Sequence, residues 1–419
     1  MAFSAGVEWE VRTTGSDTNG GGWNAASSGT DYSQQDSPQV TYTDLVIGAT
    51  TTQITSVAFP FTALHVGNII NITSGTGFTV QRVEVISVAA TVATCDKSVG
   101  TAASTGGNGK LGGGLATTTL AVTLPNTGNT VHIKAGTYTV TAITQIAGVN
   151  HTWVGYQTTH NDRGTKPLIT TATNSATLFA IGAGHLFWRN ISFSNTASTR
   201  DGCLNANGNF PAIVAVDCIF DGFTWAIESL GGNFGHVSVF GCAFKNYTTS
   251  SRCIYMPFRG EVHGCWFTGG TNASSLAVAA ANGISVTHTI FSSLAGSAVD
   301  FANGNSCCFV NCSFYAVAKN CIGSASNFQA LLANNIFYLC ATGAGGPAAI
   351  NGNSSTEGAQ GYNAFGANGT DRAGTMYNSF QDITLSADPF TNAAGDDFTL
   401  NSTAGGGALL KSLGFQWGA

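Results

Sequence analysis

One residue type marks a repeat along the middle of the chain. Phenylalanine recurs at successive spacings of 27, 24, 23, 24, 23 and 23 residues. The members of this phenylalanine column are Phe193, Phe220, Phe244, Phe267, Phe291, Phe314 and Phe337. The positions seven, five and two residues before each phenylalanine are mostly apolar as well. These aligned columns predict a structural repeat of about 23–24 residues.

Within each repeat the apolar positions alternate in two short runs. The columns at −7 and −5, and again at −2 and 0, have the period of two that strands show. The phase changes at −3, where turn-forming residues gather: Asn190, Asp217, Gly241, Gly264, His288, Asn311 and Asn334. A third apolar segment follows in several repeats, at Trp225–Ile227, Cys253–Tyr255, Val299–Phe301 and Cys321–Ile322. Three short strands per repeat predict an all-β chain that folds as a right-handed parallel β-helix.

The composition agrees with an all-β fold and excludes several other classes of protein. Hydrophobic residues make up 43% and charged residues 9% of the chain, the opposite of a disordered protein. Glycine is abundant (54 residues), but proline is scarce (8 residues) and no Gly-X-Y period occurs, which excludes collagen. The net charge is −6 without a basic run, and no apolar stretch reaches the length of a membrane span. We therefore expect neither a nucleic-acid partner nor membrane insertion.

The N-terminal sequence favours synthesis in the cytoplasm, and this origin affects how the cysteines are interpreted. The first residues lack the basic region and apolar core of a secretory signal. The chain has 11 cysteines and no Cys-X-X-Cys pair. Four of them fall in the −2 column of the repeat, namely Cys218, Cys242, Cys265 and Cys312. We expect a buried ladder of reduced thiols there, in preference to disulfides or metal ligands.

Both ends of the chain resemble a known superfamily. Trp9–Arg12 and Gly15–Gly21 resemble the opening of pectate-lyase-like right-handed β-helix proteins. Gly128–Tyr138 is similar to the first complete coil of these proteins, a strand that ends in Gly-Thr-Tyr. Their late coils and closing segment are similar to Asn334–Tyr338, Gly361–Phe365, Asp388–Phe390 and Gly395–Leu400. The resemblance implies a β-helix fold for most of the chain.

One departure from that superfamily lies near the N-terminus. The opening motif and the Gly-Thr-Tyr coil normally lie close together, whereas about 70 residues separate them here. The alternating runs Val66–Ile72 and Arg82–Val88 in this stretch predict a small inserted β-module. We expect a cap with the first strands at 1–40, the inserted module at 41–114, the β-helix at 115–380 and a closing segment at 381–419. This combination resembles proteins encoded by tailed phages and environmental bacteria.

Enzymes with this fold need acidic residues at matching positions of successive coils. A lyase requires a calcium site of clustered carboxylates with a basic residue, and a hydrolase requires two or three facing carboxylates. The acids between residues 190 and 350 are Asp201, Asp217, Asp221, Glu228, Glu261 and Asp300. They share no column of the repeat. We therefore predict no catalytic metal site and no cofactor.

Two small polar groups are the weak candidates for a catalytic site. Asp217 and Asp221 lie close together in the sequence. His263, with Arg259 and Glu261, forms the densest polar group of the repeat. Solvated turn and surface residues are the alternative interpretation of both groups.

Aromatic residues outside the phenylalanine column are the remaining indication of function. Trp225 and Trp266 are candidate ligand-binding residues, because flat apolar rings on an outer face can stack on sugars. Packing in a second layer beneath other side chains is the alternative for both.

These observations predict a protein that acts by presenting a binding or assembly surface and does not catalyse a reaction. We expect a non-catalytic structural or adhesive protein, such as a fibre, spike or capsid decoration of a phage virion. Its partners would be further copies of itself or other virion proteins, and a surface polysaccharide. A polysaccharide lyase or hydrolase of the pectate-lyase-like class is the alternative function. A bacterial surface or filament-forming protein is a second alternative, and it would place the chain outside the cell or on its surface.

Overall fold

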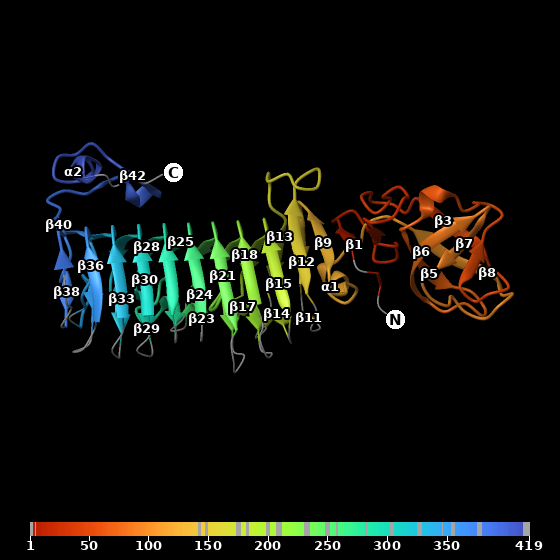
Figure 1. The fold of residues 1–419 in the computed structure, drawn as a ribbon, viewed down its shortest axis with the longest axis horizontal. Coiled ribbons are helices and arrows are strands. Elements are labelled where there is room, and N and C mark those ends of the chain that lie inside the picture. The colour runs from red at the N-terminus through yellow and green to blue at the C-terminus, as the bar shows by residue number, and fades with distance from the viewer. Residues whose placement is uncertain are drawn as a thin grey trace. The chain divides into compact units, whose positions relative to one another are not determined.

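The computed structural model describes most of the chain. The described residues are 3–4, 6–140, 144–146, 150–172, 177–181, 184–197, 202–206, 212–229, 235–247, 252–256, 259–280, 283–301, 306–324, 329–345, 347–352, 357–374 and 379–413. The chain divides into two compact units. The first comprises residues 1–140, 144–170 and 185–192, and the second comprises 141–143, 171–184 and 193–419. Strands dominate both units (Figure 1).

The first unit contains the opening strands and the first coils of a parallel solenoid. Its elements outside the inserted module are β1 (Val7–Val11), β2 (Gly22–Asn24), α1 (Thr118–Ala121), β9 (Asn129–Lys134), β10 (Thr137–Thr139), β11 (Thr144–Ile146), β12 (His151–Tyr156), β13 (Leu168–Thr171) and β15 (His185–Arg189). Strand β1 pairs in parallel with β9, β9 with β12, and β12 with β15. Trp9, Val131, Trp153 and Trp188 are aligned across these strands and are completely buried. They form the apolar interior of these coils.

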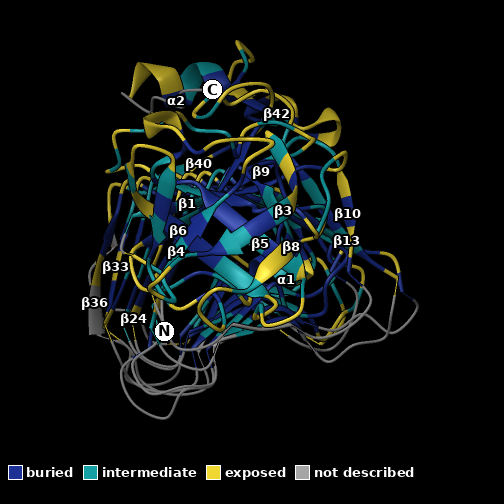
Figure 2. Cartoon of the chain, turned by 90° about the vertical axis from the view of Figure 1, so that its right-hand side faces the viewer, coloured by how far each residue is buried: buried dark blue, intermediate teal, exposed yellow. Residues whose placement is uncertain are grey.

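The inserted module is a closed six-stranded antiparallel barrel. Its strands are β3 (Val40–Ile47), β4 (Gln53–Thr55), β5 (Ile69–Ser74), β6 (Gln81–Ala89), β7 (Val92–Cys95) and β8 (Thr105–Leu111), in the order β3-β4-β7-β6-β5-β8, with the short 3-10 helix η1 (Ala63–His65) between β4 and β5. Alternate residues such as Ile70, Ile72, Val83 and Val85 fill its core, and exposed residues lie mainly in the loops (Figure 2). The barrel confirms the predicted β-module.

The barrel is inserted without interrupting the solenoid, because the chain enters and leaves it at neighbouring points. The amide of Gln39, just before β3, donates to the carbonyl of Leu111 at the end of β8, at 2.9 Å, and the amides of Gly20 and Gly21 donate to the carbonyls of Gly112 and Gly113, at 2.9 and 3.0 Å. A Cβ atom on Gly20 would lie 2.0 Å from the Ile69 carbonyl oxygen, so this position of the opening motif requires glycine. Strand β1 can therefore pair directly with β9, although the whole barrel separates them in sequence.

The second unit consists of coils that each contribute one strand to three parallel sheets. The first sheet contains β18 (Ala212–Val216), β21 (His236–Phe240), β24 (Arg259–His263), β27 (Ile284–Thr287), β30 (Ser306–Val310), β33 (Gln329–Ala333), β36 (Glu357–Gly361) and β39 (Ser379–Phe380). The second contains β16 (Ser192–Asn195), β19 (Ile219–Asp221), β22 (Ala243–Lys245), β25 (Trp266–Thr268), β28 (Ile290–Leu294), β31 (Ser313–Val317), β34 (Ile336–Tyr338), β37 (Ala364–Gly366) and β40 (Ile383–Thr384). The third contains β14 (Thr177–Ile181), β17 (Gly202–Ala206), β20 (Ile227–Ser229), β23 (Arg252–Met256), β26 (Leu276–Ala280), β29 (Ser297–Phe301), β32 (Ile322–Ser324), β35 (Ile350–Asn351) and β38 (Arg372–Ala373). This arrangement confirms the predicted β-helix.

The phenylalanine column forms one continuous stack inside the second unit. Its rings lie nearly parallel, with 4.6–5.1 Å between successive ring centroids and 4–12° between ring planes. The structure adds Phe365, whose ring lies 5.0 Å from that of Phe337. Every ring in the stack is at most 3% exposed. Each ring therefore contributes apolar burial and a stacking contact with the coil on either side.

The −3 column is a column of left-handed backbone bends. All seven of its residues, Asn190, Asp217, Gly241, Gly264, His288, Asn311 and Asn334, have φ between 52° and 60°. Glycine adopts this conformation without strain, and asparagine, aspartate and histidine adopt it more readily than other residues. The bend directs the chain from the first sheet into the second, which explains the change of phase in the sequence.

The −2 column holds the thiols that the repeat predicted to be buried. Cys218, Cys242, Cys265 and Cys312 are at most 2% exposed. The Cys242 thiol lies 3.4 Å from the Ala215 carbonyl oxygen of the preceding coil. Later coils place asparagine in this column, and Asn335 Nδ2 donates to Asn363 Oδ1 at 3.0 Å. The cysteines and asparagines of this column thus form contacts between neighbouring coils. The reduced state of the thiols stays a prediction.

The closing segment folds over the outer face of the second sheet. It contains β41 (Phe390–Asn392), the short 3-10 helix η2 (Ala393–Gly395), β42 (Asp397–Leu400) and α2 (Gly407–Ser412), and β41 pairs antiparallel with β42. Phe390 and Phe398 pack edge-on against Tyr315, at 5.9 and 6.0 Å between ring centroids. This part of the outer face is therefore covered. None of the helices in the described part of the chain has the length and apolar character that crossing a bilayer requires.

The stack generates a stability prediction. Replacing Phe267 by alanine should lower the free energy of unfolding by about 3–5 kcal/mol, because the closely packed rings on both sides cannot fill the cavity. Phe240→Ala is the matched control, since Phe240 is a half-buried ring on the outer side of β21. Chemical unfolding followed by tryptophan fluorescence measures both losses. Equal and small losses in the two variants would contradict the stack.

Candidate functional site

The polar group around His263 lies on one strand of the first sheet. Along β24, Arg259, Glu261 and His263 are exposed and alternate with buried residues, so all three side chains point outward. His263 Nδ1 lies 2.8 Å from Thr287 Oγ1 of the next coil. The three side chains therefore share one face of the strand, and the histidine already forms a hydrogen bond between coils.

The two aspartates lie elsewhere in the coils. Asp217 occupies a left-handed bend, and Asp221 lies on β19 of the second sheet. Asp221 accepts a hydrogen bond of 2.8 Å from Asn246 Nδ2, and its register partner on the next coil is Lys245. Glu261 lies on a strand of the first sheet. The strand register therefore brings neither aspartate beside Glu261, and the candidates do not form one site.

The two tryptophans differ in their surroundings. Trp266 is half-buried on the outer side of β25, where its indole N–H donates to Ser292 Oγ at 2.9 Å. Lys245 Nζ lies 4.8 Å from the centroid of the same ring. Trp225 is also half-buried, but its indole nitrogen is buried. This nitrogen packs closely against Gly202, where a Cβ atom would lie only 1.9 Å from it. Trp266 thus has the outward polar surroundings of a contact residue, whereas Trp225 is partly packed.

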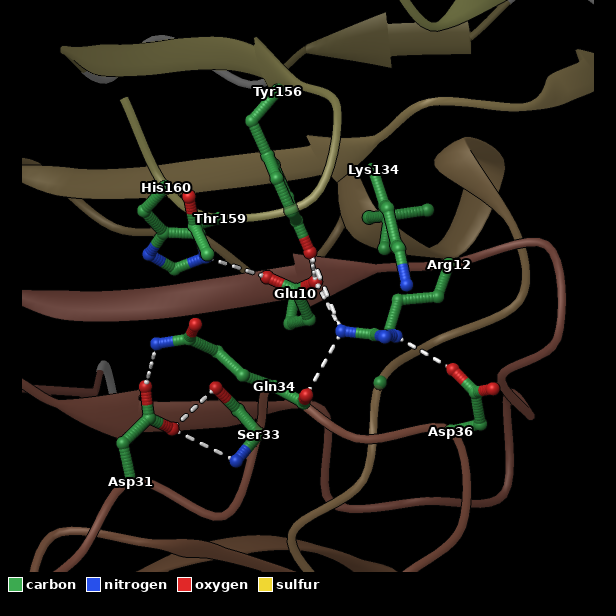
Figure 3. A network of polar contacts seen from close by, with 12 residues as sticks. Glu10, Arg12, Asp31, Ser33, Gln34, Asp36, Lys134, Tyr156, Thr159 and His160 are labelled. Carbon is green, nitrogen blue, oxygen red and sulfur yellow. Dashed lines mark hydrogen bonds and ion pairs between the residues drawn. The ribbon is translucent and has the colours of Figure 1, made fainter. Parts of the chain in front are cut away.

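A denser polar arrangement lies in the first unit, on the outer side of its first parallel strands. We call it the first-coil cluster, and its residues are Glu8, Glu10, Arg12, His132, Tyr156 and His160. Glu10 and His132 are register partners on β1 and β9, and side chains at paired positions of parallel strands lie on the same face. Tyr156 ends β12, and His160 lies in the loop that follows it (Figure 3).

Glu10 is the centre of the cluster and is only 1% exposed. Its Oε1 accepts a hydrogen bond from the Tyr156 hydroxyl and lies 3.3 Å from Arg12 Nη1. Its Oε2 lies 3.0 Å from His160 Nε2. Burial, and then the Glu10 charge, raise the pKa of Tyr156, so this hydroxyl stays protonated as a donor. These contacts compensate the removal of the Glu10 carboxylate from water.

A second loop completes the surroundings of Arg12. The guanidinium Nη1 donates to the Gln34 carbonyl oxygen at 2.9 Å, and Nε donates to Asp36 Oδ1 at 2.6 Å (Figure 3). Hydrogen bonds from Thr14 and from Arg12 hold the pKa of Asp36 below its usual value. Arg12 therefore connects the outer face of the strands to the loop that contains Gln34 and Asp36.

The two histidines of the cluster lie face to face. Their ring centroids are 3.7 Å apart and their planes differ by 8°. His132 is 7% exposed, and within the described part of the chain neither of its ring nitrogens makes a hydrogen bond. Its Nε2 lies 3.5 Å from Glu8 Oε2, and this contact with His132 lowers the pKa of Glu8. One donor atom from each of Glu8, His132 and His160 lies within 4.8 Å of the other two.

The sequence reasoning did not identify this cluster. Its residues lie at positions 8 to 12, 132, and 156 to 160, and the barrel separates the first group from the others. Two signals were present in the sequence. Glu8, Glu10 and Arg12 alternate with apolar residues, and His132 stands between Val131 and Ile133. A direct pairing of β1 with β9 would have placed these polar residues together.

Comparison with known proteins gives only distant structural matches. No family model and no curated protein matches the sequence. The tailspike protein gp49 from Pseudomonas phage LKA1 matches with 10% identity and a TM-score of 0.27, over 83% of this chain and 61% of the tailspike. The catalytic unit of the thermostable GH87 alpha-1,3-glucanase from Streptomyces thermodiastaticus strain HF3-3 matches with 10% identity and a TM-score of 0.29, over 83% of this chain and 86% of that unit. The chain thus spans less than two thirds of the tailspike. The β-helix itself is established by the strand pairing described above.

Proposed function

We propose that this protein is a non-catalytic structural or adhesive component of a phage virion, which presents the outer faces of a β-helix to a surface polysaccharide. One observation carries the proposal. The outward polar groups that the sequence singled out connect one coil to the next. Asp221 accepts from Asn246, His263 bonds Thr287, and Trp266 donates to Ser292, all at 2.8–2.9 Å.

Such bonds fit a structural role better than a catalytic one. A general acid or base must exchange protons with a substrate and needs a second group placed across the reacting bond. Asp221 lies opposite Lys245 in register, and Glu261 lies between Ser238 and Ser285. The carboxylates therefore have cationic or hydroxyl neighbours in the ladder. This pattern supports a structural role for these side chains, in which they join neighbouring coils along their outer faces.

The adhesive part of the proposal rests on the second sheet. Lys245 and Trp266 lie beside each other on its outer face, and Asp221 and Asn246 are hydrogen-bonded nearby. An aromatic ring flanked by hydrogen-bonding groups suits a sugar, which has an apolar ring face and a rim of hydroxyls. The closing segment covers a later part of the same sheet, around Tyr315. Trp266 is therefore our proposed contact residue for a polysaccharide.

Binding without turnover is the expected result with polysaccharides. The full chain should bind one or more members of a panel of acidic and neutral polysaccharides, measured by glycan array or calorimetry, with and without calcium. Trp266→Ala should abolish binding and leave the chain folded, with a loss of about 0.5–1.5 kcal/mol in stability because its hydrogen bond to Ser292 is removed. Tyr362→Ala is the control, because Tyr362 is an exposed aromatic residue outside this surface. Cleavage of a polysaccharide by the unaltered chain, seen as newly formed sugar ends, would contradict this result. If Glu261→Gln or Asp221→Asn abolished that cleavage, the lyase or hydrolase alternative would be established.

A place in the virion predicts a fixed copy number. Quantitative mass spectrometry of purified particles should find this chain in a constant ratio to the major capsid protein. A structural component keeps that ratio through density-gradient purification, since it is part of the assembled particle. Loss of the chain during purification, or its recovery on the bacterial surface without particles, would contradict the virion assignment.

A further inference from the structure

The first-coil cluster contains a buried histidine that could bind a metal ion. His132 is more than nine-tenths buried, and neither of its ring nitrogens makes a hydrogen bond with any residue that the structure describes. A buried imidazole without hydrogen bonds is unfavourable unless another partner is present. Its neighbours are Glu8 at 3.5 Å and the ring of His160 at 3.7 Å between centroids. Two imidazoles and a carboxylate are a donor set that divalent zinc and related ions prefer.

We propose that Glu8, His132 and His160 bind a divalent first-row transition-metal ion such as Zn²⁺, which fixes the loop from residue 157 to 167 on the outer face of the first strands. Glu8 comes from β1, His132 from β9 and His160 from the loop after β12. One ion would therefore join three segments that are distant in sequence. This inference is independent of the proposed polysaccharide binding.

The charges around the site favour a cation. Glu8 is acidic. Of the charged residues nearby, Glu10 and Asp36 are acidic and Arg12 and Lys134 are basic (Figure 3). Arg12 is occupied by Glu10 and Asp36. The carboxylate of Glu8 is 30% exposed, and its contact in the described structure is with His132 Nε2 at 3.5 Å. An ion at this position would neutralise Glu8 and give both imidazoles a bond.

Glu10 already makes the contact that orients a metal-binding histidine. Such histidines usually donate their second ring N–H to a carboxylate or carbonyl, which fixes the ring. Glu10 Oε2 lies 3.0 Å from His160 Nε2, and the Tyr156 hydroxyl and Arg12 hold Glu10 in place. We therefore assign Glu10 as a positioning residue.

Binding requires a defined movement of His160. A tetrahedral ion about 2.1 Å from each donor places the donors about 3.4 Å apart, so groups now up to 4.8 Å apart must approach. An ion coordinated by both imidazoles must also lie in both ring planes, which face-to-face rings do not allow. His132 is fixed on a strand, and His160 lies in a loop. The His160 ring is therefore the group that tilts.

The loop is built to present His160. The side chain of Asp162 accepts hydrogen bonds from the backbone amides of Gln157, Thr158 and Thr159. Asn161, directly after His160, adopts a left-handed conformation with φ of 73°. Lys166 Nζ donates to Asn190 Oδ1 at 2.9 Å at the end of the loop. Local bonds thus shape the loop on both sides of His160.

Metal titration of the full chain tests the site. After treatment with a chelator and its removal, Zn²⁺ should bind at one site per chain in calorimetry, and Co²⁺ should give visible absorption bands of a nitrogen- and oxygen-coordinated ion. His160→Gln should abolish this site without unfolding the chain, because the side chain lies in a loop. Glu10→Gln should weaken binding about 10- to 100-fold, as loss of a positioning contact does. His185→Gln, which changes an exposed histidine at the start of β15, should bind as the unaltered chain does.

Proteolysis provides a second readout. Arg163 is exposed in the loop and offers a trypsin site. Zn²⁺ should slow cleavage after Arg163 in the unaltered chain and in His185→Gln, and should have no effect on His160→Gln. Absence of Zn²⁺ and Co²⁺ binding would overturn the proposal. It would also be overturned if His160→Gln retained the site, or if His185→Gln lost it.

Discussion

The stacking of like side chains from coil to coil is the constraint on which the second unit depends. Phe244 and Phe267 lie ring on ring with their centroids 4.6 Å apart, close to the spacing of adjacent parallel strands. A shift of either strand by one residue would turn its phenylalanine outward, because side chains alternate between the faces of a strand. The stack therefore fixes the register of the second sheet. The register of the first and third sheets is fixed as a consequence, since every coil passes through all three sheets.

The left-handed bend makes this stacking possible. If the strand before the bend simply continued, the −5 and −2 positions would point to opposite faces, and only one could be buried. A single residue with positive φ between them returns both to the interior. The cost of that conformation explains why asparagine, aspartate, histidine and glycine occupy the −3 column. Asp217 and His288 therefore have a structural reason for their positions, which weakens any catalytic interpretation of Asp217.

The sequence was sufficient for the parts of the structure whose signals are local and repeated. Phe193 to Phe337, the bend residues and two strands of the barrel, β5 and β6, could be recognised from alternation and spacing. The first-coil cluster could not, because its residues come together only through the direct pairing of β1 with β9. His160 was still harder to foresee, since it reaches the cluster through a loop and not through a strand. The tryptophans were also ambiguous, because alternation distinguishes inside from outside but does not show that Gly202 packs against Trp225.

The central claim is that successive phenylalanines are in contact, and a double-mutant cycle measures such a contact directly. Phe244→Leu, Phe267→Leu and the double variant should show a coupling energy of about 0.5–1.5 kcal/mol, the usual value for an aromatic pair in contact. The same cycle on Phe220 and Phe337, which lie several coils apart, should give a coupling near zero. Equal couplings for the near and the distant pair, or none for Phe244 with Phe267, would contradict the stacked architecture.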